Sequence, residues 1–98
     1  MVVIVHSQWL PEGAIEMGKR FKDQETLADY ITMKGPFIHS TKGEGIQAVA
    51  LYEFDRVRLA DAVEHINNRY VAYYGVPGFT YTANVWLDVG EALSMVGL

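Results

Sequence analysis

The sequence predicts a single α+β domain, spanning residues 1–98, in the order strand, helix, strand, strand, helix, strand and short terminal helix. Runs of β-branched and aromatic residues alternate with amphipathic segments, and glycines and prolines separate them. At 98 residues the chain is long enough for one domain and too short for two. This order predicts a four-stranded antiparallel sheet with both main helices on one face, so the other face stays uncovered.

The first strand is expected over residues 2–9, which are β-branched and aromatic and include no turn former. A helix should follow from Pro11 to about Lys22, because proline fits the first helical turn and Glu12 favours the positive end of the helix dipole. One side of this helix is expected to dock on the sheet, and it carries Ala14, Ile15, Gly18 and Phe21.

The second strand is expected over residues 38–41. An earlier start at Thr32 stays open, with Gly35 and Pro36 then marking a bulge or an edge position. Residues 43–45 form the turn of a hairpin. Their two glycines join two strands and open no helix, so they are a weak signal for a phosphate-binding loop.

The second half of the chain has the clearest periodicity. After a strand over residues 46–54, Asp55 is a good N-cap for a helix. The buried side of that helix recurs at spacings typical of an α-helix and carries Leu59, Val63, Ile66, Tyr70 and Tyr73. A fourth strand is expected over residues 79–87. Asp88 and Glu91 then resemble a capping box for a short helix through Val96.

Composition excludes several classes of function. The chain has no cysteine, which rules out thiolate nucleophiles and disulfides. The net charge of −4 is spread over mixed acidic and basic residues, so no basic patch favours nucleic acid. The first residues resemble neither a signal peptide nor a membrane span, and we expect a cytoplasmic protein without membrane contact.

Strand parity predicts what the uncovered face looks like, because successive side chains in a strand point to opposite faces. The alternate residues of each strand form two sets, one for each face of the sheet. The fully apolar sets suit the helix-covered side. The remaining sets still place Ile4, Val49, Leu51 and Trp86 on the open face. That is more contiguous apolar surface than a monomer usually leaves in water, so we expect a homodimer that buries sheet against sheet.

The element order, the aromatic second helix leading through Gly75 to Phe79, and the last strand with its short helix resemble the dimeric α/β barrel group of ferredoxin-like proteins. The resemblance covers nearly the whole chain and is one of architecture. It is closest to small stand-alone domains of unassigned activity, which are similar in fold to antibiotic-biosynthesis monooxygenases and haem-degrading proteins. Those enzymes use Asn, Trp and His side chains without thiols, and we do not carry their residue roles over to positions of this chain.

The best candidate cluster shares the open face and comprises His6, Gln8, Glu53, Asn84 and Trp86. Histidine can act as a general base near neutral pH, and Asn and Trp donors can hold a phenolic or carbonyl oxygen. We therefore take His6, Asn84 and Trp86 as candidate catalytic residues. The candidate ligand-binding residues are Gln8, Leu51, Glu53 and Tyr81. A purely structural role for His6 and Asn84, as hydrogen-bonded interface residues, stays the simpler alternative.

Two further uses of the side chains are disfavoured. A metal site would need His6, His39 and Glu53 to converge without any ligand motif, so no metal and no cofactor are predicted. Base stacking would use Trp9, Tyr52, Phe54 and Trp86, but the acidic balance of the chain argues against it.

Two functions remain. One is a cofactor-independent oxygenase or isomerase acting on a small aromatic molecule. The other is a non-catalytic small-molecule-binding or structural dimer module. The sequence leaves open whether a pocket lies between two sheets or between the sheet and its helices.

Overall fold

The computed structural model describes residues 1–43 and 45–98. Its helices and strands are β1 (Val2–Trp9), α1 (Ala14–Lys22), β2 (Thr32–Thr41), β3 (Gly45–Glu53), α2 (Leu59–Val71), β4 (Thr80–Trp86) and α3 (Val89–Ser94). Short 3-10 turns, Pro11–Gly13 and Arg56–Arg58, lead into α1 and α2. The strands form one antiparallel sheet in the order β2-β3-β1-β4, an α+β fold compatible with a ferredoxin-like arrangement.

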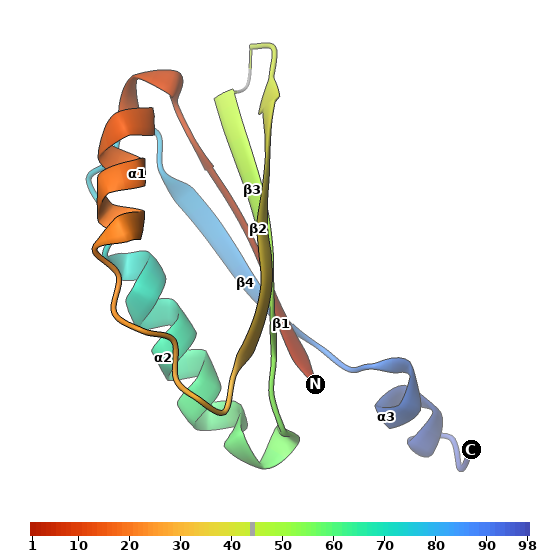
Figure 1. Cartoon of the computed structure of the whole chain (residues 1–98). Helices are drawn as coiled ribbons and strands as arrows, with labels where there is room; N and C mark the ends of the chain where they lie inside the picture. Colours follow the sequence, from red (N-terminus) through yellow and green to blue (C-terminus); the bar gives the residue numbers. More distant parts are fainter. Residues whose placement is uncertain (44) are drawn as a thin grey trace.

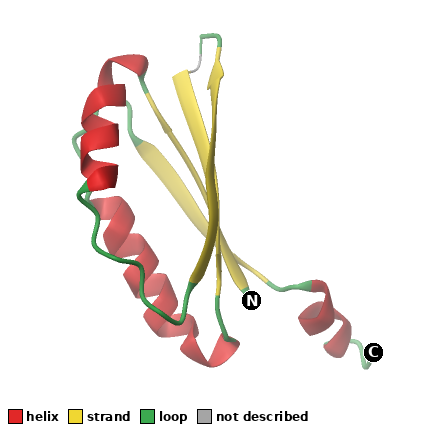
Figure 2. Ribbon diagram, viewed as in Figure 1, coloured by secondary structure: helices red, strands yellow, loops and turns green. Residues whose placement is uncertain are grey.

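The sheet forms one layer and the helices α1 and α2 form a second, and α3 forms an arm that extends from them. Helices α1 and α2 lie on the same side of the sheet, and α3 lies on the other side, beyond the end of β4 (Figures 1 and 2). Within the described part of the chain, no helix is long and apolar enough to span a membrane.

The strand parity expected from the sequence is confirmed. Val3 and Val5 of β1 are almost completely buried beneath the helices, with Ala50 and Tyr52 of the neighbouring β3. The intervening residues face the other side, where Ile4 is paired with Leu51 on β3 and Asn84 on β4. The core therefore lies between the sheet and the helix layer.

Strand β2 takes the longer of the two expected forms, beginning at Thr32. The pairing register with β3 shifts between Lys34 and Phe37, and Gly35 has a φ of +94° in between. This bulge keeps both Lys34 and Phe37 on the open face, because it inserts an extra residue into one strand. The expected hairpin turn over residues 43–45 includes residue 44, which lies outside the described residues.

Helix α1 docks by a side somewhat different from the expected one. Met17 is buried, whereas Ile15, expected to face the sheet, is among the most exposed apolar residues. The inward side is centred on Ala14, Met17 and Phe21, whose spacings of three and four residues place their side chains on one side of a helix. Ile15 comes one residue after Ala14, which places it about 100° further around the helix.

The helix starts follow the sequence signals. The Asp55 carboxylate accepts a hydrogen bond from the Val57 N–H at 3.0 Å, before α2. Before α3, Asp88 and Glu91 form the expected capping box, with each side chain accepting from the backbone N–H of the other at 2.7 and 3.0 Å. The short terminal helix ends at Ser94, two residues earlier than expected.

Candidate functional site

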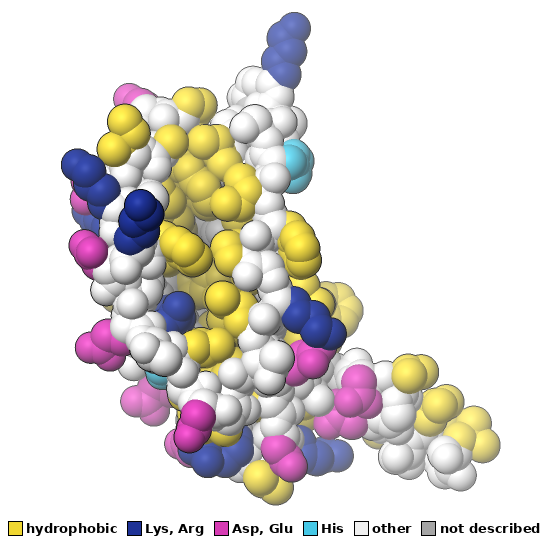
Figure 3. Space-filling model, viewed as in Figure 1, with side chains coloured by type: hydrophobic (Ala, Val, Ile, Leu, Met, Phe, Trp, Pro, Cys, Tyr) yellow, Lys and Arg dark blue, Asp and Glu magenta, His cyan; other side chains and the backbone are white. Residues whose placement is uncertain are grey.

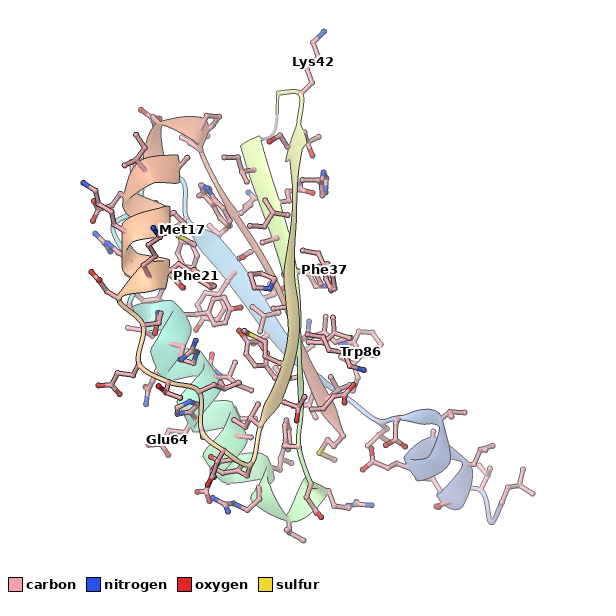
Figure 4. The ribbon with its side chains drawn as sticks, viewed as in Figure 1. Met17, Phe21, Phe37, Lys42, Glu64 and Trp86 are labelled. Carbon is pink, nitrogen blue, oxygen red and sulfur yellow. The ribbon has the colours of Figure 1, made fainter. Side chains whose placement is uncertain are left out.

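A cavity of about 320 Å³ lies between α1 and the sheet. Figure 3 shows it as a hollow lined by hydrophobic side chains between α1 and β2. In Figure 4, Met17 and Phe21 extend from α1 toward the sheet over this space. The sheet contributes Trp9 and Tyr52, and α2 contributes Tyr70.

Small residues on facing elements leave this space unfilled. Gly18 of α1 and Ala48 of β3 both line the cavity. A Cβ atom placed on Gly18 would have no neighbouring atom within 4 Å. Small-molecule sites are concave and mostly apolar, so this hollow is a candidate binding site.

Aromatic rings form the end of the cavity that lies under α2. The Tyr52 and Tyr70 hydroxyl groups are hydrogen-bonded at 2.8 Å, and their rings meet edge to face with centroids 6.3 Å apart. Tyr70 also stacks on Tyr81 of β4 at a centroid distance of 5.2 Å. The Tyr81 hydroxyl donates to the Asn67 side-chain oxygen at 2.8 Å, so this wall is fixed by both ring packing and hydrogen bonds.

Burial keeps these phenols neutral. It raises the pKa of Tyr52, although the hydrogen bond from Tyr70 and the nearby Arg69 guanidinium act in the opposite direction. Burial also raises the pKa of Tyr70, and the adjacent Tyr52 adds to that effect. Arg69 lines the same cavity and donates to the Glu25 carbonyl at 2.7 Å. The site therefore offers phenol donors and one fixed positive charge.

Trp9 is one of the residues that line the cavity. Its indole Nε1 is the one buried side-chain nitrogen or oxygen in residues 1–43 and 45–98 that has no hydrogen-bond partner. A buried donor without a partner costs about 1–3 kcal/mol, so such groups are rare in folded proteins.

Apart from Tyr81, the site residues predicted from the sequence lie elsewhere, on the open face. His6 and Gln8 line a shallower depression of about 290 Å³ near one end of the sheet. Asn84 and Leu51 flank Ile4 in the next row, and Glu53 and Trp86 flank Val2 in the row after that. Successive rows are about 7 Å apart, so these side chains share a face but do not converge on one point within a single chain.

Two of these residues have other contacts. Glu53 forms an ion pair with Lys34 at 3.0 Å. Tyr81 lines the same depression as His6 and Gln8, and its ring belongs to the aromatic wall described above. The catalytic roles of His6, Asn84 and Trp86 stay predictions. So do the ligand-binding roles of Gln8, Leu51, Glu53 and Tyr81.

The disfavoured alternatives gain no support from the structure. Among the described residues, no group of three His, Asp or Glu side chains is placed to hold a metal ion. Of the four aromatic residues considered for base stacking, Trp9, Tyr52 and Phe54 are buried beneath the helices. Only Trp86 is on the open face, so no stacking platform of the expected kind forms.

Sequence reasoning missed the cavity itself. The available signal was the small residues at inward positions, Gly18 on the helix and Ala48 on the strand, facing larger aromatic residues. Comparison with protein-family models, with curated proteins and with solved structures gives no match. The fold and the site together define a small α+β protein with an apolar cavity between helix and sheet.

Proposed function

We propose that this protein binds a small aromatic molecule carrying a hydrogen-bond acceptor in the cavity between α1 and the sheet. The observation that carries the proposal is the apolar cavity itself, and one of its lining residues, Trp9, has a buried indole N–H without a hydrogen-bond partner. A volume of about 320 Å³ is at the lower end of small-molecule sites, which combine apolar walls with a few placed polar groups.

Matched probes test this proposal. Naphthol supplies a fused ring and an oxygen, and naphthalene supplies the same ring without the oxygen. Calorimetric titration should give tighter binding of naphthol than of naphthalene, and Trp9→Phe should reduce that difference, because the substitution removes the donor and keeps an aromatic ring. Equal affinities for the two probes, or an unchanged preference in Trp9→Phe, would argue against a role for the indole N–H.

A blocking variant locates the binding site. Ala48→Phe places a ring in the cavity and should abolish naphthol binding. Ile15→Phe adds a ring on the exposed outer side of α1 and serves as the control. Circular dichroism would establish that both variants fold. Naphthol binding that survives Ala48→Phe would exclude the cavity as the site.

The second part of the proposal is a homodimer of the dimeric α/β barrel type, in which the open sheet faces of two copies meet. Phe37 and Trp86 on this face are 60% and 52% exposed in the single chain, with Ile4 and Leu51 between them. Burying aromatic and aliphatic side chains is the main favourable contribution to association. Light scattering coupled to size exclusion should give twice the monomer mass.

A cytoplasmic location stays a prediction.

An oxygenase or isomerase acting on the same aromatic class is the second candidate. The paired hydroxyls of Tyr52 and Tyr70 beside Arg69 favour it, because donors and a positive charge stabilise negative charge developing on a substrate oxygen. Product formation that Tyr70→Phe slows, without weakening binding, would support catalysis there. A loss of turnover in His6→Ala or Asn84→Ala, with the dimer intact, would instead place the chemistry on the open face. Binding of the aromatic molecule without formation of a product would leave a non-catalytic binding module as the function.

A further inference from the structure

Helix α3 and the residues after it present apolar side chains that nothing in the single chain covers. The exposed fractions of the large apolar side chains in this segment run from 43% to 87% and belong to Val89, Leu93, Met95, Val96 and Leu98. None of the residues in α3 is buried. The segment is helical, and its apolar side chains are largely uncovered by the rest of the chain.

This arrangement is unfavourable for an isolated chain in water. α3 has six residues, and helices of that length are not stable without tertiary packing. The capping box at Asp88 and Glu91 fixes the start of the helix but buries no apolar surface. An ordered, exposed, apolar helix is typical of a segment that packs on another molecule.

The position of α3 connects it to the open sheet face. In Figure 1, α3 lies on the side of the sheet away from α1 and α2. Figure 4 shows Phe37 and Trp86 pointing to that same side. Trp86 ends β4, and only Leu87 and Asp88 separate it from α3. The open face and α3 are therefore continuous, and one partner could cover both.

Charge identifies the kind of partner. On the open face, Lys34 and Glu53 neutralise each other in an ion pair at 3.0 Å. At the start of α3, the carboxylate of Glu91 contacts the Met1 ammonium group at 2.7 Å. Asp88 adds a second carboxylate 3.5 Å from the same ammonium group. Residues 86–98 include no Lys or Arg, so α3 lacks the cations that draw amphipathic helices to anionic membranes. A second copy matches this surface, because it brings apolar side chains together with charged groups that are already paired within each chain.

We propose that α3 of each subunit packs against the other subunit, so that the two arms extend the sheet-to-sheet interface on both sides. A twofold axis through the open faces brings each arm to the partner, because the same surface of both subunits takes part in such an interface. This inference rests on the homodimer proposed above and names the segment that stabilises it.

The test compares dimer dissociation constants, measured by sedimentation equilibrium, for the full chain and three variants. Leu93→Glu/Val96→Glu charges the arm, Ile4→Glu charges the sheet face, and Ile15→Glu charges an exposed apolar position on the outside of α1. We expect the arm variant to weaken the dimer at least about tenfold, because two apolar contacts are lost in each half of a symmetric interface. Ile15→Glu should leave the dissociation constant unchanged.

A second measurement does not depend on a disruptive substitution. The chain has no cysteine, so Ser94→Cys gives a unique site on α3 for an environment-sensitive dye. The dye emission should shift to the blue as protein concentration rises through the dimer dissociation constant. The same emission at all concentrations would overturn the proposed arm contact.

The other outcomes are distinguishable. A full chain that stays monomeric overturns both the dimer and the arm contact. A dimer lost in Ile4→Glu but unaffected by Leu93→Glu/Val96→Glu retains the sheet interface and overturns the role of α3. Binding of the monomer to phosphatidylcholine–phosphatidylglycerol vesicles, abolished by the arm variant, would identify a membrane as the partner and overturn the proposal.

Discussion

The hydroxyl groups of Tyr52 on β3 and Tyr70 on α2 lie 2.8 Å apart in the core. This hydrogen bond joins the sheet to the helix that covers it, and both rings form part of the cavity wall. The same pair therefore affects the stability of the fold and the shape of the candidate site. A perturbation of either hydroxyl should be detectable in both properties.

Removing one hydroxyl leaves the other without its partner. Tyr70→Phe should lower the free energy of unfolding by about 1–3 kcal/mol, measured by urea denaturation, because the buried Tyr52 hydroxyl loses its hydrogen bond. Adding Tyr52→Phe should cost little more than the first substitution, because the unsatisfied group is then removed as well. Tyr30→Phe is the control, since it keeps the ring that Arg58 contacts. Additive losses in the double variant would show that the two hydroxyls do not interact.

Alkaline pH should act on the same residues. Burial raises the pKa of Tyr52, Tyr70 and Tyr73 above the ordinary value of 10.0, so the folded chain retains protons that the unfolded chain releases. The free energy of unfolding should therefore show no contribution from these groups below pH 10.0 and fall as the pH rises above it. Tyrosinate absorbance during a pH titration measures the effect. Full ionisation of the six tyrosines with the fold still intact would contradict the buried positions of these phenols.

Much of this fold could be predicted from local sequence signals. The β-branched and aromatic residues at positions 2–9 indicated β1, and strand parity indicated its buried side, because a strand has only two faces. The spacing of Leu59, Ile66 and Tyr70 gave α2 and its inward side, because the helical period is short and well defined. Asp88 and Glu91 indicated the start of α3, since a capping box depends only on residues three positions apart.

Features that depend on the distance between elements were not predictable in the same way. The inward side of α1 includes Met17 instead of Ile15, because the rotation of a helix on a sheet is decided by all of its neighbours. Two of the residues that line the cavity, Gly18 and Ala48, are small and fill little of this space. The site residues were therefore expected on the open face around His6, where polar side chains share a surface, and the hollow between α1 and the sheet was not identified.

Gly18 offers a direct way to strengthen α1. Glycine in a helix interior is less favourable than alanine by about 0.5–1 kcal/mol, because it loses more conformational freedom on folding. A Cβ atom at Gly18 would meet nothing within 4 Å, so Gly18→Ala introduces no clash. We expect it to raise the free energy of unfolding by about that amount in urea denaturation. Destabilisation by Gly18→Ala would mean that α1 lies closer to the sheet than the 320 Å³ cavity implies.

Gly45 controls how closely β3 approaches the end of β1, and Gly43 provides a matched comparison. Both have positive φ values, +84° at Gly43 and +89° at Gly45, which L-residues adopt at a cost of about 1–2 kcal/mol. A Cβ atom at Gly43 would have no neighbour within 4 Å, but one at Gly45 would lie 2.6 Å from the Trp9 carbonyl oxygen. Gly45→Ala should therefore lose about 1–3 kcal/mol more than Gly43→Ala in urea denaturation, because the added atom must push two backbones apart.

The same substitution should disturb the cavity, since Trp9 forms part of its wall. Gly45→Ala is expected to weaken naphthol binding in calorimetric titration, whereas Gly43→Ala should leave the affinity unchanged. Because both variants carry the same side chain at a positive φ, the difference between them isolates the contact with Trp9. Equal losses of stability and equal affinities in the two variants would mean that the position of Trp9 does not depend on the close approach of Gly45.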